Sequence, residues 1–172
     1  MAELSRRGQE IVEAARELVE REGSSALTMR ALAARVGVRA PSLYKHLPGK
    51  DELEAYVVDA ALDDLSHSLE QVKGLEEIAH AYRRFALARP HLYRLAASSP
   101  AASERFELAA APPLLRVLGS ARRARAAWAF MHGMADLELA GRFATDADVE
   151  AAWEAGIAAF RPPSLLASRR GV

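Results

Sequence analysis

The chain has 172 residues, and its 23 Lys/Arg and 23 Asp/Glu give a formal net charge of zero at pH 7. Hydrophobic residues make up 51% of it, which excludes a disordered chain and allows one compact domain or two small ones sharing a core. The sequence contains no cysteine, which excludes disulfides and thiolate zinc sites and suits a reducing cytoplasm.

The N-terminal stretch "MAELSRRGQEIVEAARELVE" carries charges throughout, so it lacks the apolar core of a signal peptide. No window approaches the roughly 20 consecutive apolar residues that a membrane-spanning helix needs. We therefore expect a cytoplasmic protein that does not interact with a membrane.

Alanine and leucine dominate and no stretch alternates like a strand, so the sequence predicts an all-α fold. In the first part of the chain, apolar residues at helical spacing predict a helix over 4–22. Thr28 fits an N-cap, and Gly37 ends the short helix that follows it. A second short helix is expected over 40–46 and a long one over about 51–72.

In the second part of the chain, Gly74 marks a boundary, and Pro112-Pro113 must break or kink the helix that contains them. These signals divide the chain into residues 1–66, residues 74–161 and a tail over 162–172. Past Gly74, helices are expected over 75–89, 91–98, 103–119, 121–142 and 147–160.

Two short helices joined by a tight glycine-containing turn form the helix-turn-helix unit, and the length of residues 28–47 fits it. In such a unit, the N-terminal residues of the second helix meet base edges in the major groove of DNA. Later residues suit phosphate and sugar contacts, and Lys50 can bind a phosphate where the next helix begins. The candidates for base edges are Arg39, Ala40, Pro41 and Ser42, and those for the DNA backbone are Tyr44, Lys45 and His46.

The charge pattern agrees with a polyanion partner. Residues 28–50 hold five Lys/Arg and no acid, whereas residues 51–70 hold seven acids and no Lys/Arg. A local basic patch can bind DNA even in a neutral protein, because salt confines the relevant field to about 8–10 Å. From charge alone, two oppositely charged surfaces that merely compensate each other remain an equal alternative.

The segment "TMRALAARVGVRAPSLYKHLPGKDEL" resembles the DNA-binding region of the tetracycline-repressor (TetR) family of bacterial transcription regulators, over about residues 7–66. The most specific matches are Gly37-Val38, Leu43-Tyr44-x-His46 and Lys50-x-x-Leu53. Leu47 stands where many members carry phenylalanine, and both residues would pack inward. The resemblance implies that DNA is contacted by Thr28, Arg39, Ser42, Tyr44, His46 and Lys50.

The resemblance also implies a helical C-terminal domain that dimerises and binds a small molecule. "WAFMHGMADLELAGRF" is similar to the Trp-x-x-x-His-Gly segment of one subgroup of such domains. Helices 121–142 and 147–160 would then form a four-helix bundle with a second subunit. Their alanines allow close helix approach, and Trp128 and Trp153 are either apolar anchors of that interface or part of the monomer core.

A ligand pocket would lie between the helices of this domain. Each candidate wall residue, taken singly, is more often ordinary core than a ligand contact. His132 on an apolar stripe needs a partner, and either it is a core histidine bonded to a backbone carbonyl, which we favour, or it is a polar group of the pocket. The candidate walls are Tyr82, Phe85, Tyr93, Phe106, Trp128, Met131, His132 and Met134.

No nucleotide-binding loop, nucleophile elbow or metal-binding histidine spacing occurs, so we expect no catalytic activity, no cofactor and no metal site. The sequence thus predicts a ligand-responsive homodimeric regulator that binds a near-palindromic operator. The resemblance favours a repressor that a small molecule releases. The alternatives are a DNA-binding protein without an effector, a helical adaptor whose basic patch binds acidic protein, and an all-α enzyme. No motif in the sequence indicates the enzyme.

Overall fold

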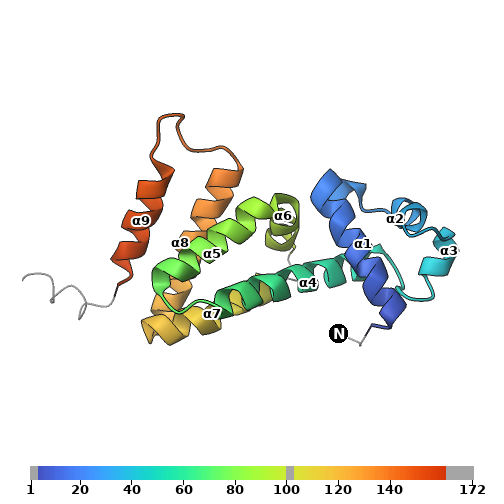
Figure 1. Cartoon of the computed structure of the whole chain (residues 1–172), viewed down its shortest axis with the longest axis horizontal. Helices are drawn as coiled ribbons and strands as arrows, with labels where there is room; N and C mark the ends of the chain where they lie inside the picture. Colours follow the sequence, from blue (N-terminus) through green and yellow to red (C-terminus); the bar gives the residue numbers. More distant parts are fainter. Residues whose placement is uncertain (1–3, 100–102, 162–172) are drawn as a thin grey trace, which may run out of the picture. The chain divides into compact units, whose positions relative to one another are not determined.

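The computed structural model describes residues 4–99 and 103–161, and within these ranges every regular element is helical (Figure 1). The predicted all-α fold is therefore confirmed for the described part of the chain. The chain divides into two compact units. The first contains the described residues up to Asp63 and those of 89–104, and the second contains those of 64–88 and those from Arg105 onward.

The first unit is built on α1 (Arg6–Glu22), which begins at Ser5, whose hydroxyl accepts a hydrogen bond from the Gly8 N–H. One apolar stripe of α1 is buried, including Ile11, Ala15 and Val19, as the helical spacing predicts. The unit also contains η1 (Ser24–Ala26), α2 (Met29–Arg35), α3 (Ala40–Leu43), the first part of α4 (Lys50–Glu70) and α6 (Pro90–Ser98).

The helix α6 is held to the end of α1 by Glu20. The carboxylate of Glu20 accepts from the Leu92 N–H at 3.1 Å, and its carbonyl oxygen lies 2.9 Å from Nδ1 of His91. A carboxylate at the N-terminus of a helix satisfies a free N–H group and interacts favourably with the helix dipole. These bonds attach residues distant in sequence to the first unit, and the division of the chain at residues 66–74 stays a prediction.

The second unit contains the rest of α4, then α5 (Leu75–Ala88), the part of α7 (Ser103–Leu118) from Arg105 onward, α8 (Ala121–Leu139) and α9 (Val149–Ala159). The predicted break at Pro112-Pro113 does not occur, because α7 continues through both prolines, and the alternative of a kink stays a prediction. Each proline removes one hydrogen bond to the residue four positions earlier. The buried Ala109, Ala110 and Leu114 on either side supply packing that offsets this loss.

An arginine cluster fixes α5, α8 and α9 to one another. Arg83 of α5 donates from Nε and Nη2 to the two carboxylate oxygens of Glu138 on α8, both at 2.9 Å. Arg83 also pairs with Glu150 of α9. The indole N–H of Trp153 donates to Glu138 at 3.2 Å, and the guanidinium lies 5.6 Å from the centre of the Trp153 ring.

The arginine cluster settles the question that the sequence left open for Trp153. Trp153 is only 2% exposed within the single chain, so it belongs to the core of the unit. Glu138 is half-buried, and Arg83 supplies the cation beside it. The hydrogen bond from Arg83 to Glu138 is the largest cause that raises the pKa of Arg83 above its ordinary value, and Glu150 contributes to the same rise.

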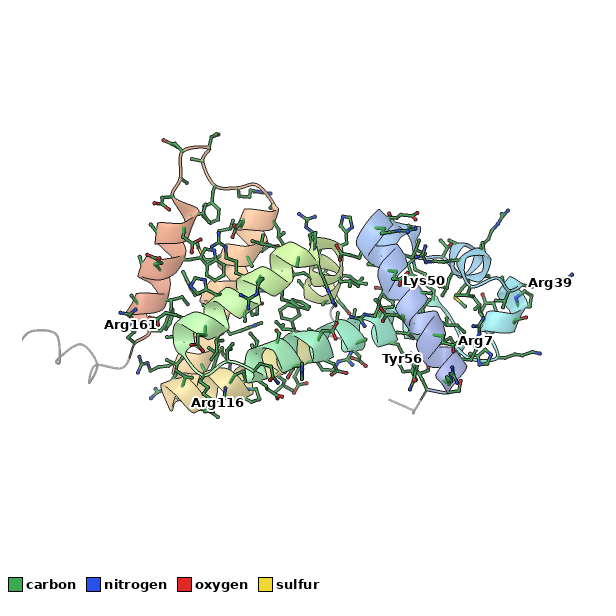
Figure 2. The ribbon with its side chains drawn as sticks, viewed as in Figure 1. Arg7, Arg39, Lys50, Tyr56, Arg116 and Arg161 are labelled. Carbon is green, nitrogen blue, oxygen red and sulfur yellow. The ribbon has the colours of Figure 1, made fainter. Side chains whose placement is uncertain are left out.

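The helices α8 and α9 approach closely at a glycine. A Cβ atom at Gly156 of α9 would overlap the ring of Phe130 of α8, which packs edge-on against Trp153. The end of α9 is held to α5 by a hydrogen bond of 2.8 Å from Nε of Arg161 to Glu76, at the position that Figure 2 labels. In the described part of the chain, no helix is long and apolar enough to cross a membrane.

The carboxylate of Glu138 is expected to stabilise the second unit more than that of Glu150. The side chains of Arg83 and Glu138 are 16% and 19% exposed, whereas that of Glu150 is 56% exposed. Glu138→Ala leaves a largely buried guanidinium and an indole N–H without their acceptor, so we expect a loss of about 1–3 kcal/mol of unfolding free energy. Glu150→Ala should cost under about 1 kcal/mol.

Urea unfolding of both variants at one protein concentration measures this difference. Equal losses for the two variants would contradict the central role given to Glu138.

Candidate nucleic-acid interface

The turn between α2 and α3 is set by Gly37. Its φ of +71° lies in the left-handed region that glycine adopts without steric cost. The Gly37 N–H bonds to the Ala34 carbonyl, and the Val38 N–H bonds to the Ala33 carbonyl at 3.0 Å. These two bonds form a Schellman motif, which ends α2 and turns the chain sharply toward α3. The predicted stop at Gly37 is therefore confirmed.

The helix α3 is shorter than the sequence predicted. It ends at Leu43, and the Leu43 carbonyl accepts from the His46 and Leu47 N–H groups, both at 2.9 Å, so residues 44–46 continue as a turn. Leu43 and Leu47 are 0% exposed. These two leucines anchor one side of the segment and leave the rest of it facing outward.

The polar residues that the sequence singled out lie on that outward side. Arg39 is the exposed N-cap of α3, and Figure 2 shows it beside α3 at the outer edge of the unit. Tyr44 is 53% exposed, a high value for an aromatic residue, so it is not part of the core. Ala40 and Ser42 are half-buried, while Pro41, Lys45 and His46 are exposed.

Two more predicted residues lie at the starts of neighbouring helices. Thr28 is the exposed N-cap of α2, and its hydroxyl accepts from the Ala31 N–H at 3.1 Å. Lys50 is the exposed first residue of α4. Free N–H groups at such helix starts suit a phosphate oxygen.

The ion pairs of the first unit divide the cations of this region into those that have an acidic partner within the unit and those that do not. Arg35 pairs with Glu17 of α1 at 2.5 Å, so one cation of the acid-free run has an internal partner, which the local sequence did not indicate. Arg7 donates to the Val36 carbonyl at 3.2 Å and joins α1 to the end of α2. Among the described residues, no carboxylate forms an ion pair with any of the remaining cations, which are Arg30, Arg39, Lys45 and Lys50.

Two family models match the chain. One, described as bacterial regulatory proteins of the tetR family, matches residues 11–57, and the other, described as the tetracyclin repressor-like C-terminal domain, matches residues 75–160. An uncharacterized HTH-type transcriptional regulator of Mycobacterium tuberculosis, Rv0681, is 31% identical over 160 residues. That alignment covers 81% of this chain and 72% of the relative. The chain belongs to the tetR family.

Solved structures share the fold of this regulator. SCO4313, a candidate regulatory protein, is 27% identical with a TM-score of 0.74, and the match covers 90% of this chain and 94% of that chain. The multidrug binding protein EbrR, solved in complex with imidazole, is 21% identical with a TM-score of 0.71. The match to EbrR covers 92% of this chain and 96% of that one. The regulator is therefore a DNA-binding transcription factor of this family with a helical C-terminal domain.

Four of the predicted pocket residues form one cluster in the second unit. Phe106 of α7 lies 6.5 Å from Tyr82, 6.4 Å from Trp128 and 5.3 Å from His132, between ring centres. The rings of Trp128 and His132 stack at 5.6 Å. Met131 is buried, Phe85 and Met134 are half-buried, and Tyr93 lies on α6 in the first unit.

The polar atoms of this cluster differ in their partners. Nδ1 of His132 lies 3.2 Å from the Tyr82 hydroxyl, so a side chain is the partner at Nδ1, and a bond from His132 to a backbone carbonyl stays a prediction. The indole nitrogen of Trp128 is buried and has no hydrogen-bond partner among the described residues. Trp128 also lines a cavity of about 150 Å³ between α7 and α8. Sequence spacing gave no sign of the unpaired indole, because it depends on contacts between helices.

The pKa of His132 predicts how stability of the regulator depends on pH. Burial lowers the pKa of His132 below its ordinary 6.5, and the nearby Asp136 offsets part of that effect. Between the folded pKa and about pH 6.5, His132 therefore binds a proton more readily in the unfolded chain than in the folded chain. The contribution of His132 to the free energy of unfolding is complete above about pH 6.5 and is lost as the pH falls through the folded pKa. The loss cannot exceed about 1.4 kcal/mol per pH unit for one such group.

Urea unfolding at pH 7.5 and pH 5.5 tests this expectation. His132→Gln should reduce the loss of stability on acidification, whereas Gln71→Ala, at an exposed residue that does not titrate, should leave it unchanged. An identical pH dependence in wild type and His132→Gln would show that His132 does not control it.

Proposed function

We propose that this regulator binds duplex DNA by placing the exposed side of α3 and the turn after it in the major groove. The observation that supports this most is the division of that segment, with Leu43 and Leu47 fully buried and Arg39, Tyr44 and Lys45 exposed. The second helix of a helix-turn-helix unit contacts base edges through its N-terminal residues. The family membership of the chain agrees with this role.

Each exposed residue has an expected role in the complex. Arg39 at the start of α3 contacts a guanine edge, and Ser42 reaches a base or a phosphate, while the small Ala40 and Pro41 let the segment enter deeply. The remaining residues bind the DNA backbone and fix the position of the unit without reading sequence. They are Thr28, Tyr44, Lys45, His46 and Lys50.

Two copies of the chain bind together on a near-palindromic operator, with their α3 segments about 34–36 Å apart. The dimer forms through the predicted helices 121–142 and 147–160, which the structure contains as α8 and α9. Besides the exposed Glu150 and Glu154, α9 carries a stripe of exposed alanines, and this stripe supports the dimer because it lets a second helix approach closely. Its residues are Ala151, Ala152, Ala155 and Ala159.

A small molecule that binds the aromatic cluster of Tyr82, Phe106, Trp128 and His132 releases the operator. The unpaired indole N–H of Trp128 favours a ligand with a hydrogen-bond acceptor, because burying that donor alone costs about 1–3 kcal/mol. The neighbouring cavity of about 150 Å³, which is lined by Trp128 but not by Tyr82, Phe106 or His132, fits a single small ring, so a larger ligand must separate α7 from α8. The fold shared with EbrR, which was solved with imidazole, is compatible with such a site.

Repression follows if the ligand-free dimer has the α3 spacing of the operator. A ligand shifts this equilibrium only by the difference between its affinities for the two conformations. A ligand that separates α7 from α8 has unequal affinities for the two conformations, because the packing of these helices in the ligand-free protein leaves no room for the ligand.

Arg39 and Lys50 are expected to contribute to DNA binding in different ways. Arg39→Ala should relax the preference at one operator base pair and cost about 1–3 kcal/mol on the preferred sequence. Lys50→Ala should weaken binding to all sequences alike and reduce the slope of log K against log salt by about one. Binding titrations on operator and unrelated duplexes over a salt series measure both effects.

Arg84→Ala is the control, because Arg84 is an exposed cation of the second unit. An Arg39→Ala protein that keeps the wild-type sequence preference would overturn the assignment of Arg39 to a base.

The ligand site predicts a response to small aromatic compounds that carry one hydrogen-bond acceptor, such as benzamide and benzaldehyde. A compound that binds should raise the unfolding free energy by about 2.7 kcal/mol at 100 times its Kd and weaken operator binding. Trp128→Phe removes the indole donor and should raise that Kd by about tenfold. Tyr44→Phe in the first unit serves as the control, and melting curves with and without compound give the measurement.

A compound that binds the wild type and the Trp128→Phe variant equally would place the ligand elsewhere. Operator affinity that does not change with bound ligand would support a regulator without an effector.

A further inference from the structure

Charged residues bridge α5 and α9 at two levels along these helices. At one level, Nε of Arg161, which follows α9, donates to Glu76 of α5 at 2.8 Å (Figure 2). At the other level, Arg83 of α5 pairs with Glu150 of α9. Residue numbers rise along α5 where they fall along α9, so the two helices run antiparallel and one further level lies between the two ion pairs.

This middle level has no bridge. It holds His80 of α5 and Glu154 of α9, and both side chains are exposed. Neither side chain forms a hydrogen bond or an ion pair with any residue that the structure describes. Instead, the two residues line a cavity of about 360 Å³ between the helices, which we call the α5/α9 cavity. A ligand in this cavity can therefore reach a carboxylate that has no partner in the described chain.

The buried walls of the α5/α9 cavity are apolar. They are formed by Ala79 of α5 and by Trp153 and Ile157 of α9, which are 3%, 2% and 3% exposed. Binding sites for small molecules typically have volumes of about 300–1,000 Å³ and combine apolar walls with a few polar groups that orient the ligand. The α5/α9 cavity has both features, so it can bury a ring or a short aliphatic chain while polar groups at its rim bind a charged end.

The charge of the cavity lining favours a cation. Two carboxylates, Glu76 and Glu154, and one guanidinium, Arg161, line the cavity and give a net charge of −1 with His80 neutral. Arg161 donates to Glu76 from both Nε and Nη2, so these two charges already neutralise each other. The carboxylate of Glu154 is the charge that remains, and it attracts a cation and repels an anion.

We propose that the α5/α9 cavity binds a small organic cation, a primary amine on an aromatic or short aliphatic body. The ammonium donates to the carboxylate of Glu154 and to a ring nitrogen of His80, and the body packs against Trp153 and Ile157. The bound cation thereby joins α5 to α9 at the level that the chain itself does not bridge.

This site is separate from the ligand site of the proposed function and does not depend on it. The cavity beside Trp128 lies between α7 and α8 and shares no lining residue with the α5/α9 cavity. A metal ion does not suit the α5/α9 cavity, because the part of the chain that the structure describes has no group of three or more His, Asp or Glu side chains that could hold one.

Three compounds of similar shape and different charge test the proposal. At about pH 7.5, 2-phenylethylamine is a cation, 2-phenylethanol is neutral and 3-phenylpropionate is an anion. Isothermal titration calorimetry of the full chain at low salt should give the amine a Kd about fivefold below that of the alcohol, and the acid should bind most weakly. An amine that does not bind at millimolar concentration, or that binds no more tightly than the alcohol, would overturn the proposal.

Substitutions at Glu154 test the contact to the ammonium. Because the side chain of Glu154 is exposed and has no partner in the described chain, Glu154→Gln should keep the fold and raise the Kd of 2-phenylethylamine by about fivefold. Glu154→Arg should reverse the preference, so that 3-phenylpropionate binds more tightly than the amine. Glu70→Gln changes an exposed acid of the same unit that does not line the cavity, and this matched control should bind the amine as the wild type does. An amine Kd that neither change at Glu154 alters would contradict the assigned contact.

Tryptophan fluorescence tests where the amine binds. The chain has two tryptophans, so Trp153 is the one that remains in Trp128→Phe. We expect 2-phenylethylamine to change the fluorescence of this variant with the same Kd as for the wild type, because Trp153 lines the α5/α9 cavity. An unchanged fluorescence together with a raised Kd would place the amine in the cluster around Trp128 and overturn the second site. Benzamide that fails to bind the wild type would overturn the ligand site of the proposed function and leave the amine result unaffected.

Discussion

The interface proposed for DNA depends on the left-handed turn at Gly37. Because the Schellman motif ends α2 there, the chain reverses within two residues and α3 begins at Arg39. The buried Leu43 and Leu47 then fix the rotation of the segment about its axis. A helix of only four residues has little stability of its own, so its orientation comes from these anchors and not from its backbone. Tyr44 is exposed for the same reason, since it lies between the two buried leucines.

In the second unit, the equivalent constraint is the cluster around Arg83. It joins three helices through Glu138, Glu150 and Trp153. Polar groups of α8 and α9 are therefore bonded to partners within the unit. The outer sides of the same helices are left with alanine, glycine and a few separated charges. One internal network therefore both positions the aromatic cluster through α5 and α8 and leaves the surface that we assign to the dimer.

The sequence predicted the order of the helices well, because apolar spacing and capping residues act locally. Thr28 caps α2 and Gly37 ends it, as their positions indicated. The errors arose where contacts between distant residues decide the outcome. Packing of α7 against its neighbours carried the helix through Pro112-Pro113, and α3 ended early at its leucine anchor. The partners of Arg35, His132 and Trp153 lie on other helices, and no local pattern encodes them. The DNA-contact and ligand residues named from the sequence stay predictions.

Methylation interference on a selected operator tests the central claim most directly, because guanine N7 lies in the major groove. The account predicts that methylated guanines block binding in two clusters about one helical turn apart, related by the near-palindrome of the site. Interference confined to adenine N3 in the minor groove, or a single cluster on one side of the duplex, would contradict an α3 segment from each of two copies in successive major grooves.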